Sequence, residues 1–374
     1  MNVDSAFPGG NIIVDGVDGD TVALHQDLRD TDIWWFYWHY RVRGAAGRSL
    51  TFQFVQGDVI GSQGPAISRD SGVSWTWLGR DGVVGTSFRY TFAADEHDVR
   101  FAFAPAYLEV DLHRFLGCNA TNSALRSAVL CHTPNGRAAE VLYLGRQDSK
   151  ERHRVLLTCR HHACESVASF ALEGLMAATL ADDPLGTWLR EQVAFMVVPF
   201  VDKDGVEDGD QGKQRRPRDH NRDYDGEGRY VTTRAIRQAV PARSMGRLRL
   251  ALDLHCPYIR GDHSEEIYCV GGPDAENWEE IQRFSVLLEQ VQTGPLPYRA
   301  ADNLPFGAGW NTADNLTQGK DFARWAGEVP GMRMATTIEI PYALVHGQVV
   351  TPDAARALGR DLAEAIGAYL EALA

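Results

Sequence analysis

Short apolar runs alternate with helical segments through the second half of the chain, and this alternation constrains the fold more than any other feature. The runs RVLLTCR (154–160), FMVVPFV (195–201), LRLALDLH (248–255) and ATTIEI (335–340) have the length and apolarity of buried strands. The segment CESVASFALEGLMAATL (164–180) between the first two has helical spacing. Strand, helix and strand repeated in this way predict an α/β sheet with helices on both faces.

The N-terminal part follows a period of two instead. In FYWHYRV (36–42), alternate residues fall on opposite faces, as in a half-buried strand, and SLTFQFV (49–55) alternates again. Turn signals such as GAAG, RDSG and GRDG separate further aromatic strands. We therefore predict a small antiparallel β-sandwich domain over residues 1–107, followed by an α/β domain over residues 108–374.

Composition and charge exclude several classes of partner. Apolar residues make up 44% and charged residues 23%, which is ordinary for a globular protein. The net charge of −13 disfavours nucleic acid and anionic membranes as partners. No basic and apolar leader opens the sequence, and the six cysteines lack CxxC spacing. These features predict a cytoplasmic protein with reduced thiols, and none of them indicates an oligomeric state.

A candidate metal site lies where the predicted strands end. His162 and Glu165 follow the strand 154–160 directly, and His255 closes the strand 248–255. Taken singly, each pattern also fits a solvated turn or a structural histidine. The carboxyl ends of strands in an open α/β sheet meet in one crevice, however, where ligands bind. Two histidines and one glutamate leave a fourth position open, which is the arrangement of catalytic zinc.

A candidate base and a candidate anion site accompany these ligands. Glu339 lies in an apolar strand, where an unpaired carboxylate is costly to bury and so indicates a functional partner. Asn221 and Arg222 lie in a loop rich in basic residues that follows the strand 195–201. A solvated loop is the alternative for such a charge run. An amide beside a guanidinium nevertheless suits recognition of a terminal carboxylate.

These residues, in this order, resemble the zinc carboxypeptidases. The pattern is His162-x-x-Glu165, then Asn221-Arg222, His255 and Glu339, with DGV at 204–206 ahead of DHNR. WFYWHYRVRGAAG, PAISRDSGVSWTWLG and PAYLEVDLHRFL further resemble the sandwich and junction of the cytosolic carboxypeptidases and their bacterial relatives. The resemblance covers nearly the whole chain and implies one Zn²⁺ held by His162, Glu165 and His255.

The resemblance also implies roles for the loop residues. Asp219 would orient His162, and Asn221 with Arg222 would hold the substrate's C-terminal carboxylate. Either Arg215 or Arg216 would polarise the scissile carbonyl, although their spacing from Asn221 departs from the family. Arg324 falls in the window that lines the pocket for the terminal side chain, where it would favour an acidic residue. The tyrosine that caps the substrate in this family is absent from NTADNLTQGKDFARWAGE (311–328).

We therefore expect a zinc-dependent carboxypeptidase that hydrolyses a C-terminal residue from peptides or protein tails, with Glu339 as the general base. Two alternatives remain at this level. A deacylase of N-acyl amino acids shares the fold and a similar residue set, although the sandwich argues against it. A non-catalytic binding protein on the same fold is the other, and the complete ligand set argues against that.

Overall fold

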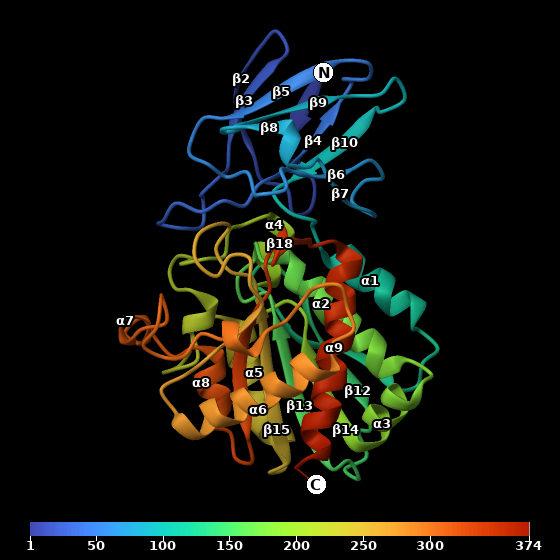
Figure 1. The fold of residues 1–374 in the computed structure, drawn as a ribbon, viewed down its shortest axis with the longest axis vertical. Helices are drawn as coiled ribbons and strands as arrows, with labels where there is room; N and C mark the ends of the chain where they lie inside the picture. Colours follow the sequence, from blue (N-terminus) through green and yellow to red (C-terminus); the bar gives the residue numbers. More distant parts are fainter. Residues whose placement is uncertain (374) are drawn as a thin grey trace.

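A computed structural model describes residues 1–373, and in it a β-rich N-terminal part stacks on a larger α/β part (Figure 1). The α/β part is built on a seven-stranded sheet with the order β11-β12-β14-β13-β15-β17-β16. Its strands are β11 (Leu125–His132), β12 (Ala138–Gly145), β13 (His153–Cys159), β14 (Val193–Val198), β15 (Leu248–His255), β16 (Tyr268–Val270) and β17 (Met334–Glu339). The central strands β14, β13, β15 and β17 run parallel, while β11, β12 and β16 are antiparallel to their neighbours. This confirms the predicted α/β fold with a mixed sheet.

Helices cover both faces of this sheet, because neighbouring strand residues point to opposite sides. Leu157 of β13 belongs to the apolar cluster shared with α2, α3, α6 and α9, whereas Leu156 belongs to the cluster shared with α5 and α8. The helices are α1 (Glu109–Cys118), α2 (Ser166–Leu180), α3 (Pro184–Gln192), α4 (Lys203–Asp208), α5 (Val231–Ser244), α6 (Ala275–Val291), α7 (Ala313–Leu316), α8 (Phe322–Gly327) and α9 (Pro352–Glu371). Short 3-10 turns are η1 (Arg80–Gly82), η2 (His220–Arg222) and η3 (Ala300–Asp302).

Two five-stranded sheets form the N-terminal part, with the orders β1-β4-β10-β6-β7 and β2-β3-β5-β9-β8. The strands are β1 (Asn2–Asp4), β2 (Ile13–Asp18), β3 (Thr21–His25), β4 (His39–Arg43), β5 (Ser49–Phe54), β6 (Ala66–Ser68), β7 (Thr76–Trp77), β8 (Val83–Val84), β9 (Ser87–Thr91) and β10 (Asp98–Ala102). Aromatic rings fill the space between the sheets, including Trp38, Phe52, Phe88 and Phe101. One pairing departs from the predicted antiparallel pattern, since β3 and β5 are parallel. The intervening β4 lies in the other sheet, so the chain returns to β5 in its original direction.

The two parts share a continuous apolar core. The run predicted as a strand from residue 36 enters the sheet only at His39, because Phe36 and Tyr37 are buried at the junction. The ring centroids of Phe36 and Phe103 lie 5.7 and 4.8 Å from that of Tyr342, which belongs to the α/β part. A small hairpin of β18 (Leu344–Val345) and β19 (Gln348–Val349) follows Tyr342. The division at residues 107 and 108 stays a prediction.

No helix within residues 1–373 combines the length and the apolarity needed to cross a membrane.

Candidate metal centre and active site

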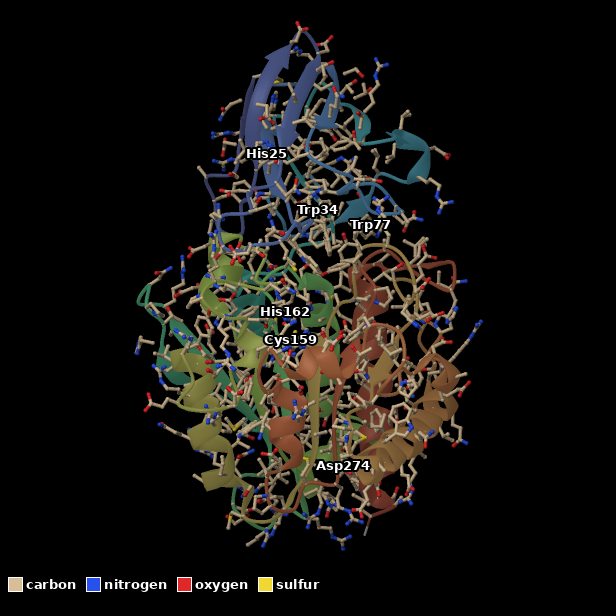
Figure 2. The ribbon with its side chains drawn as sticks, turned by 90° about the vertical axis from the view of Figure 1, so that its left-hand side faces the viewer. His25, Trp34, Trp77, Cys159, His162 and Asp274 are labelled. Carbon is tan, nitrogen blue, oxygen red and sulfur yellow. The ribbon has the colours of Figure 1, made fainter. Side chains whose placement is uncertain are left out.

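Three parallel strands end side by side at the edge of the α/β part nearest the sandwich. Cys159, the last residue of β13, pairs with Leu254, and His255 at the end of β15 pairs with Glu339 at the end of β17. His162 follows β13 by three residues and lies near the junction with the sandwich (Figure 2). The parallel register therefore brings the strand-end residues into one site.

The side chains of the three predicted metal ligands converge, and both histidines point their Nδ1 atoms toward the Glu165 carboxylate. His162 Nδ1 lies 2.8 Å from Glu165 Oε1, His255 Nδ1 lies 2.7 Å from Glu165 Oε2, and the two Nδ1 atoms are 3.1 Å apart. All three side chains are buried, with exposed fractions of 3% or less. Zinc bonds of about 2.0–2.2 Å to nitrogen and oxygen can reach both Nδ1 atoms and a carboxylate oxygen of Glu165 from one position.

The outer nitrogen of each histidine has its own carboxylate. Asp219 Oδ1 lies 3.1 Å from His162 Nε2, and Asp253 Oδ2 lies 2.6 Å from His255 Nε2. A carboxylate on Nε2 favours the tautomer that keeps the proton there, so that Nδ1 is left free to bind a metal. The contact predicted between Asp219 and His162 is present.

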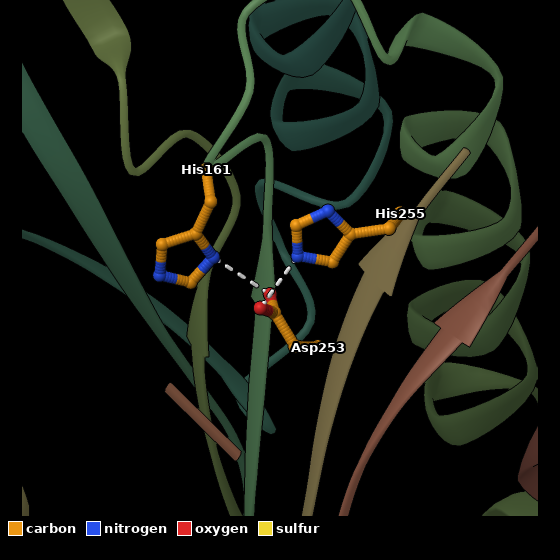
Figure 3. A group of neighbouring side chains, drawn as sticks. All are labelled: His161, Asp253 and His255. Atoms are coloured by element: carbon orange, nitrogen blue, oxygen red, sulfur yellow. Dashed lines mark hydrogen bonds and ion pairs between the residues drawn. The ribbon is translucent and has the colours of Figure 1, made fainter. Parts of the chain in front are cut away.

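Asp253 was not assigned a role from the sequence. It stands between two imidazoles (Figure 3), because its other oxygen lies 2.8 Å from His161 Nδ1. His161 Nε2 in turn lies 2.7 Å from the Tyr224 hydroxyl. Asp253 and His255 are two residues apart on β15, so both point to the same face of the sheet. That Asp-x-His spacing is the signal that could have identified Asp253.

The charges of this cluster favour a cation. Burial opposes the charged imidazolium, yet the carboxylates of Asp219 and Glu165 outweigh it and raise the pKa of His162. Burial likewise opposes ionisation of Asp253, but His161 and His255 hold the pKa of that carboxyl below its ordinary range. Glu165 is buried, and its two carboxylate oxygens face one imidazole nitrogen each, at 2.8 and 2.7 Å. Excess carboxylate charge and inward-facing Nδ1 atoms around one carboxylate fit a divalent metal that displaces protons.

Glu339 lies beside this cluster without belonging to it. Its side chain is 6% exposed and lines a cleft of about 820 Å³ together with His162 and His255. Burial and the neighbouring Glu165 raise the pKa of Glu339, although His255 opposes the shift. Glu339 Oε2 has no hydrogen-bond partner in the described part of the chain. A buried carboxylate with a raised pKa and a free oxygen is suited to accept a proton.

The anion site predicted at Asn221 and Arg222 opens onto the same cleft. Both residues lie in η2, where Asn221 Oδ1 accepts a hydrogen bond from Phe322 N at 2.9 Å and Asn221 Nδ2 lies 3.3 Å from His255 Nε2. The Nε atom of Arg222 is buried without a partner among the described residues. Arg222 therefore has donors available for an anion.

Neither arginine predicted to polarise the carbonyl lines the cleft. The guanidinium of Arg215 is 2.8 Å from Asp202 and 2.7 Å from Asp210, within a cluster of buried carboxylates. Arg216 is 55% exposed and pairs with Asp32 at 3.2 Å on the surface. Asp202 and Asp210 hold Arg215 from the preceding part of the same segment, whereas Asp32, the partner of Arg216, lies far away in the sequence.

Lys213, from the same loop, does line the cleft. Its Nζ lies 3.3 Å from His162 Nδ1 and 3.7 Å from Glu165 Oε1. The sequence showed Lys213 as a member of the basic loop and assigned no role to it. Only the folded loop distinguishes it from its neighbours.

Arg324 also lines the cleft, on α8, together with Thr337 and Arg333. Arg324 forms no ion pair within residues 1–373, so its charge is available to a substrate. The tyrosine-free stretch 311–328 is preceded by Trp310, which is 46% exposed and lines the cleft. An aromatic side chain is therefore present at this rim, although its position in the chain differs from that of the family's capping tyrosine.

One further group of acidic and histidine side chains lies outside this cleft. Glu109, His113 and Glu140 come together at the surface near α1 and β12. The ammonium of Lys203 lies 2.8 Å from Glu109 and 3.0 Å from Glu140, so it already neutralises the carboxylates. This group therefore resembles an ion-pair cluster more than a metal site.

The fold and the cleft together define a class of protein. A mixed α/β sheet presents two histidines, two glutamates and an asparagine–arginine pair at the ends of its parallel strands. Residues 118–238 match the Peptidase_M14 family model, described as zinc carboxypeptidase. This match, over about a third of the chain, confirms the predicted resemblance to the zinc carboxypeptidases.

Related sequences match shorter parts of the chain. It is 31% identical over 157 residues to cytosolic carboxypeptidase 3 of Mus musculus, which covers 39% of this chain and 16% of that protein. It is 27% identical over 218 residues to an uncharacterised protein of Zymomonas mobilis, which covers 55% of this chain and 54% of the relative. The chain thus spans about half or less of these relatives.

Solved structures match the whole chain. A metallo-carboxypeptidase from Burkholderia cenocepacia superposes with a TM-score of 0.80 at 20% identity, covering 100% of both chains. A metallo-carboxypeptidase from Pseudomonas aeruginosa in complex with (2-guanidinoethylmercapto)succinic acid superposes with a TM-score of 0.78 at 21% identity, again covering 100% of both chains. These similarities establish that the sandwich and the α/β part together form a known architecture.

Proposed function

We propose that this chain is a zinc-dependent carboxypeptidase that removes the C-terminal residue of a peptide or protein tail. One observation carries the proposal. His162, Glu165 and His255 converge on one point beside Glu339, next to a cleft that also contains Arg222. The names of the relatives support a location in the cytoplasm, as do the six cysteines, all of which are unpaired.

The division of labour follows from the positions of the side chains. His162, Glu165 and His255 would hold the metal, with Asp219 and Asp253 fixing the two imidazoles. Bound zinc supplies Lewis acidity, which activates a water molecule and polarises the scissile carbonyl. Glu339 accepts the proton that the water loses as its oxygen bonds to the carbonyl carbon. The same carboxyl then donates that proton to the amine as the C–N bond breaks.

Substrate orientation falls to the cations of the cleft. Asn221 and Arg222 would hold the terminal carboxylate, since a guanidinium keeps its charge and binds carboxylates with two hydrogen bonds. Arg324 would face the terminal side chain and favour glutamate or aspartate there. Because Asn221 and Arg222 would bind a free C-terminal carboxylate, internal peptide bonds should be poor substrates.

The test begins with metal content and substrate class. Purified protein should contain about one zinc per chain, as bound structural or catalytic zinc generally survives purification. It should release single residues from peptides ending in Glu, Asp, Leu or Lys, as followed by mass spectrometry. Release from N-acyl aspartate or N-succinyl glutamate alone would instead identify a deacylase. A protein without zinc and without either activity would be a binding protein.

The Glu339→Gln variant tests the assigned base. The amide cannot accept the proton, so kcat should fall by about 100- to 10,000-fold, the usual contribution of a general base. Zinc content should stay at the wild-type level, because Glu339 is not among the ligands. Turnover at the wild-type rate would show that another group is the base.

A further inference from the structure

The developing negative charge on the scissile carbonyl oxygen needs a positive or hydrogen-bonding group near the metal. Arg215 is held by Asp202 and Asp210, and Arg216 lies at the surface. Both arginines would have to break their ion pairs to reach the cleft. Lys213 lies in the cleft already.

Lys213 is close to the atoms on which the metal would be held. Its Nζ is 3.3 Å from His162 Nδ1 and 3.7 Å from Glu165 Oε1, and its side chain is 29% exposed toward the cleft. A cation that stabilises the carbonyl oxygen beside the metal must lie close to the metal ligands. Lys213 does so, and its flexible stem allows the ammonium to withdraw by the width of a bound oxygen.

An N-terminal segment holds the loop that carries Lys213. The side chain of Asp30 accepts hydrogen bonds from Gln211 N at 3.0 Å and from Gly212 N at 2.8 Å, with one carboxylate oxygen for each. Thr31 Oγ1 donates to the carbonyl of Lys213 itself at 2.8 Å. Because these bonds fall on the backbone of residues 211–213, they set the direction in which Lys213 leaves the loop.

The Gln211 side chain adds a second set of bonds to the same segment. It accepts from Tyr37 N at 2.8 Å and donates to the carbonyls of Tyr37 and Asp27 at 2.9 and 3.1 Å. Gln211 is fully buried, so these bonds have no competition from water. The loop is thus attached to residues 27–37 along its whole inner edge.

The opposite edge of the loop presses on the metal-binding turn. Gly212 has a φ of +76°, and a Cβ placed there would be 2.1 Å from Ala163 N, next to His162. Gln211 O accepts a hydrogen bond from Cys164 N at 3.2 Å. The loop is therefore confined between residues 27–37 and residues 161–165, with Lys213 as the side chain that emerges at the cleft.

Trp35 closes the remaining side. Lys213 Nζ lies 5.7 Å from the centre of the Trp35 ring, within the range of a cation–π contact. Trp35 is itself held by Phe36, stacked at 4.9 Å, and by Tyr258, edge-on at 5.1 Å. The aromatic ring of Trp35 limits where the Lys213 ammonium can move. Unlike a carboxylate, the ring does not neutralise the charge of that ammonium.

We propose that Lys213 is the cation that stabilises the negative charge on the scissile carbonyl oxygen, and that Asp30 and Thr31 of the N-terminal part are positioning residues that hold it at the metal centre. The proposal rests on the proposed carboxypeptidase function. It makes the sandwich part of the catalytic apparatus, since the segment 27–37 links β3 to β4.

Variants of Lys213 test the catalytic part in the full-length, zinc-loaded protein. Lys213→Met keeps the length of the side chain and removes its charge, so kcat on the best peptide should fall by about 100- to 1,000-fold with KM within about threefold, the cost of losing one oxyanion donor. Lys213→Arg should recover part of the loss. Arg216→Met, on the same loop but at the surface, is the matched control and should retain wild-type kcat.

Two further measurements separate a catalytic role of Lys213 from a role in which its charge only balances the nearby carboxylates. Affinity for zinc is measured by chelator competition, and affinity for a peptide phosphonate, whose charged oxygen mimics the carbonyl oxygen in the reaction, by calorimetry. We expect Lys213→Met to bind zinc at least as tightly as wild type and the phosphonate at least about tenfold more weakly. Wild-type kcat and phosphonate affinity at saturating zinc would overturn the proposal and leave the proposed function intact. Absence of peptide hydrolysis by the wild-type protein would instead overturn the proposed function.

The positioning part is tested by a double-mutant cycle. Asp30→Asn and Thr31→Val should each lower kcat by about three- to tenfold without loss of zinc, whereas Thr31→Ser and the exposed control Asp32→Asn should not. On the Lys213→Met background, Asp30→Asn should cost little further activity, because the group that it positions is already gone. Equal losses on both backgrounds would show that Asp30 acts on stability alone and would overturn the positioning role.

Discussion

At the scale of single residues, the candidate metal centre is built from pairs. Each ligand histidine has a carboxylate behind it, Asp219 for His162 and Asp253 for His255. Buried charges are tolerated only where such partners are present, so ligand and partner must form together. The residues that make the site acidic therefore also make it rigid, which suits a metal that must be held in one geometry.

Arg324 is expected to set the preference for the terminal side chain. Replacing it with glutamine removes a charge that no described carboxylate neutralises, so kcat/KM for peptides ending in Glu should fall by about 10- to 100-fold relative to Leu, as expected for one lost charged hydrogen bond. Competing peptides in one digest, quantified by mass spectrometry, measure this ratio. Arg283→Gln is the control, since Arg283 lines the cleft but is paired with Glu280 at 2.9 Å. An unchanged Glu-to-Leu ratio in Arg324→Gln would assign the pocket to another residue.

His39 is expected to make stability fall in acid. It is fully buried between the rings of Phe7 and Trp75, and burial together with Arg100 lowers its pKa to about 3. The native state then binds fewer protons than the unfolded state below the ordinary histidine pKa of about 6.5. The stabilising contribution is complete above that pH and is lost as the pH falls toward 3.

Urea unfolding at two pH values tests this directly. Between pH 7.5 and pH 5, wild type should lose about 2 kcal/mol more of its free energy of unfolding than His39→Phe, because roughly 1.5 pH units lie below the unfolded pKa. The phenylalanine keeps a ring in the aromatic pocket and removes the titration. Equal losses in the two proteins would mean that His39 is accessible to protons in the native state.

At the scale of elements, two glycines determine how the helices of one face pack. Gly174 of α2 and Gly359 of α9 stand where the helices cross, and a Cβ on either would be 2.0 Å from a backbone carbonyl of the other helix. Because α2 also lies against the sheet strands that lead to the metal turn, this crossing supports the position of Glu165 at the start of α2. Small residues at the crossing are thus part of how the site is held.

Gly359→Ala should accordingly be destabilising, although alanine is the better helix former. The added methyl group meets backbone that cannot move cheaply, so the free energy of unfolding should fall by about 1–3 kcal/mol, the usual cost of overpacking. Gly117→Ala in α1 meets open space and serves as the control, where a gain of up to about 1 kcal/mol is expected. Denaturant curves of both variants measure the difference. A gain in Gly359→Ala would show that the helices can separate without cost.

At the scale of the whole molecule, the sandwich and the α/β part share one apolar core. Phe36 and Phe103 pack on Tyr342, and Trp77 Nε1 donates to the carbonyl of Val350 at 2.7 Å. The Lys213 loop adds a row of hydrogen bonds across the same junction. Neither part would keep its buried surface covered if the other unfolded.

We therefore expect heat to unfold the zinc-free chain in one cooperative transition. Differential scanning calorimetry should give a calorimetric enthalpy close to the van't Hoff enthalpy. Phe36→Ala should lower the midpoint of that single transition, because its ring contacts both parts. Two resolved transitions, only one of them shifted by Phe36→Ala, would mean that the sandwich folds independently.

Much of this architecture was predictable from the sequence. Strand-length apolar runs and helical spacing depend on local periodicity, so the α/β sheet and its strand ends could be predicted from segments of about ten residues. The ligand pattern of His162, Glu165 and His255 followed once those ends were known, because parallel strands bring their carboxyl ends together. Glu339 followed from the cost of burying an unpaired carboxylate in an apolar strand.

The tertiary structure decided which basic side chain reaches the cleft and what holds it there. Lys213, Arg215 and Arg216 are near neighbours in one loop. Their different positions depend on Asp30 and Asp32, which are far away in the sequence, and on Asp202, which follows β14. The parallel pairing of β3 with β5 and the second partner of Asp253 likewise depend on contacts far apart in the chain. Local patterns in a sequence report what each segment buries, whereas the direction of a loop side chain depends on hydrogen bonds that form only after the two parts have packed together.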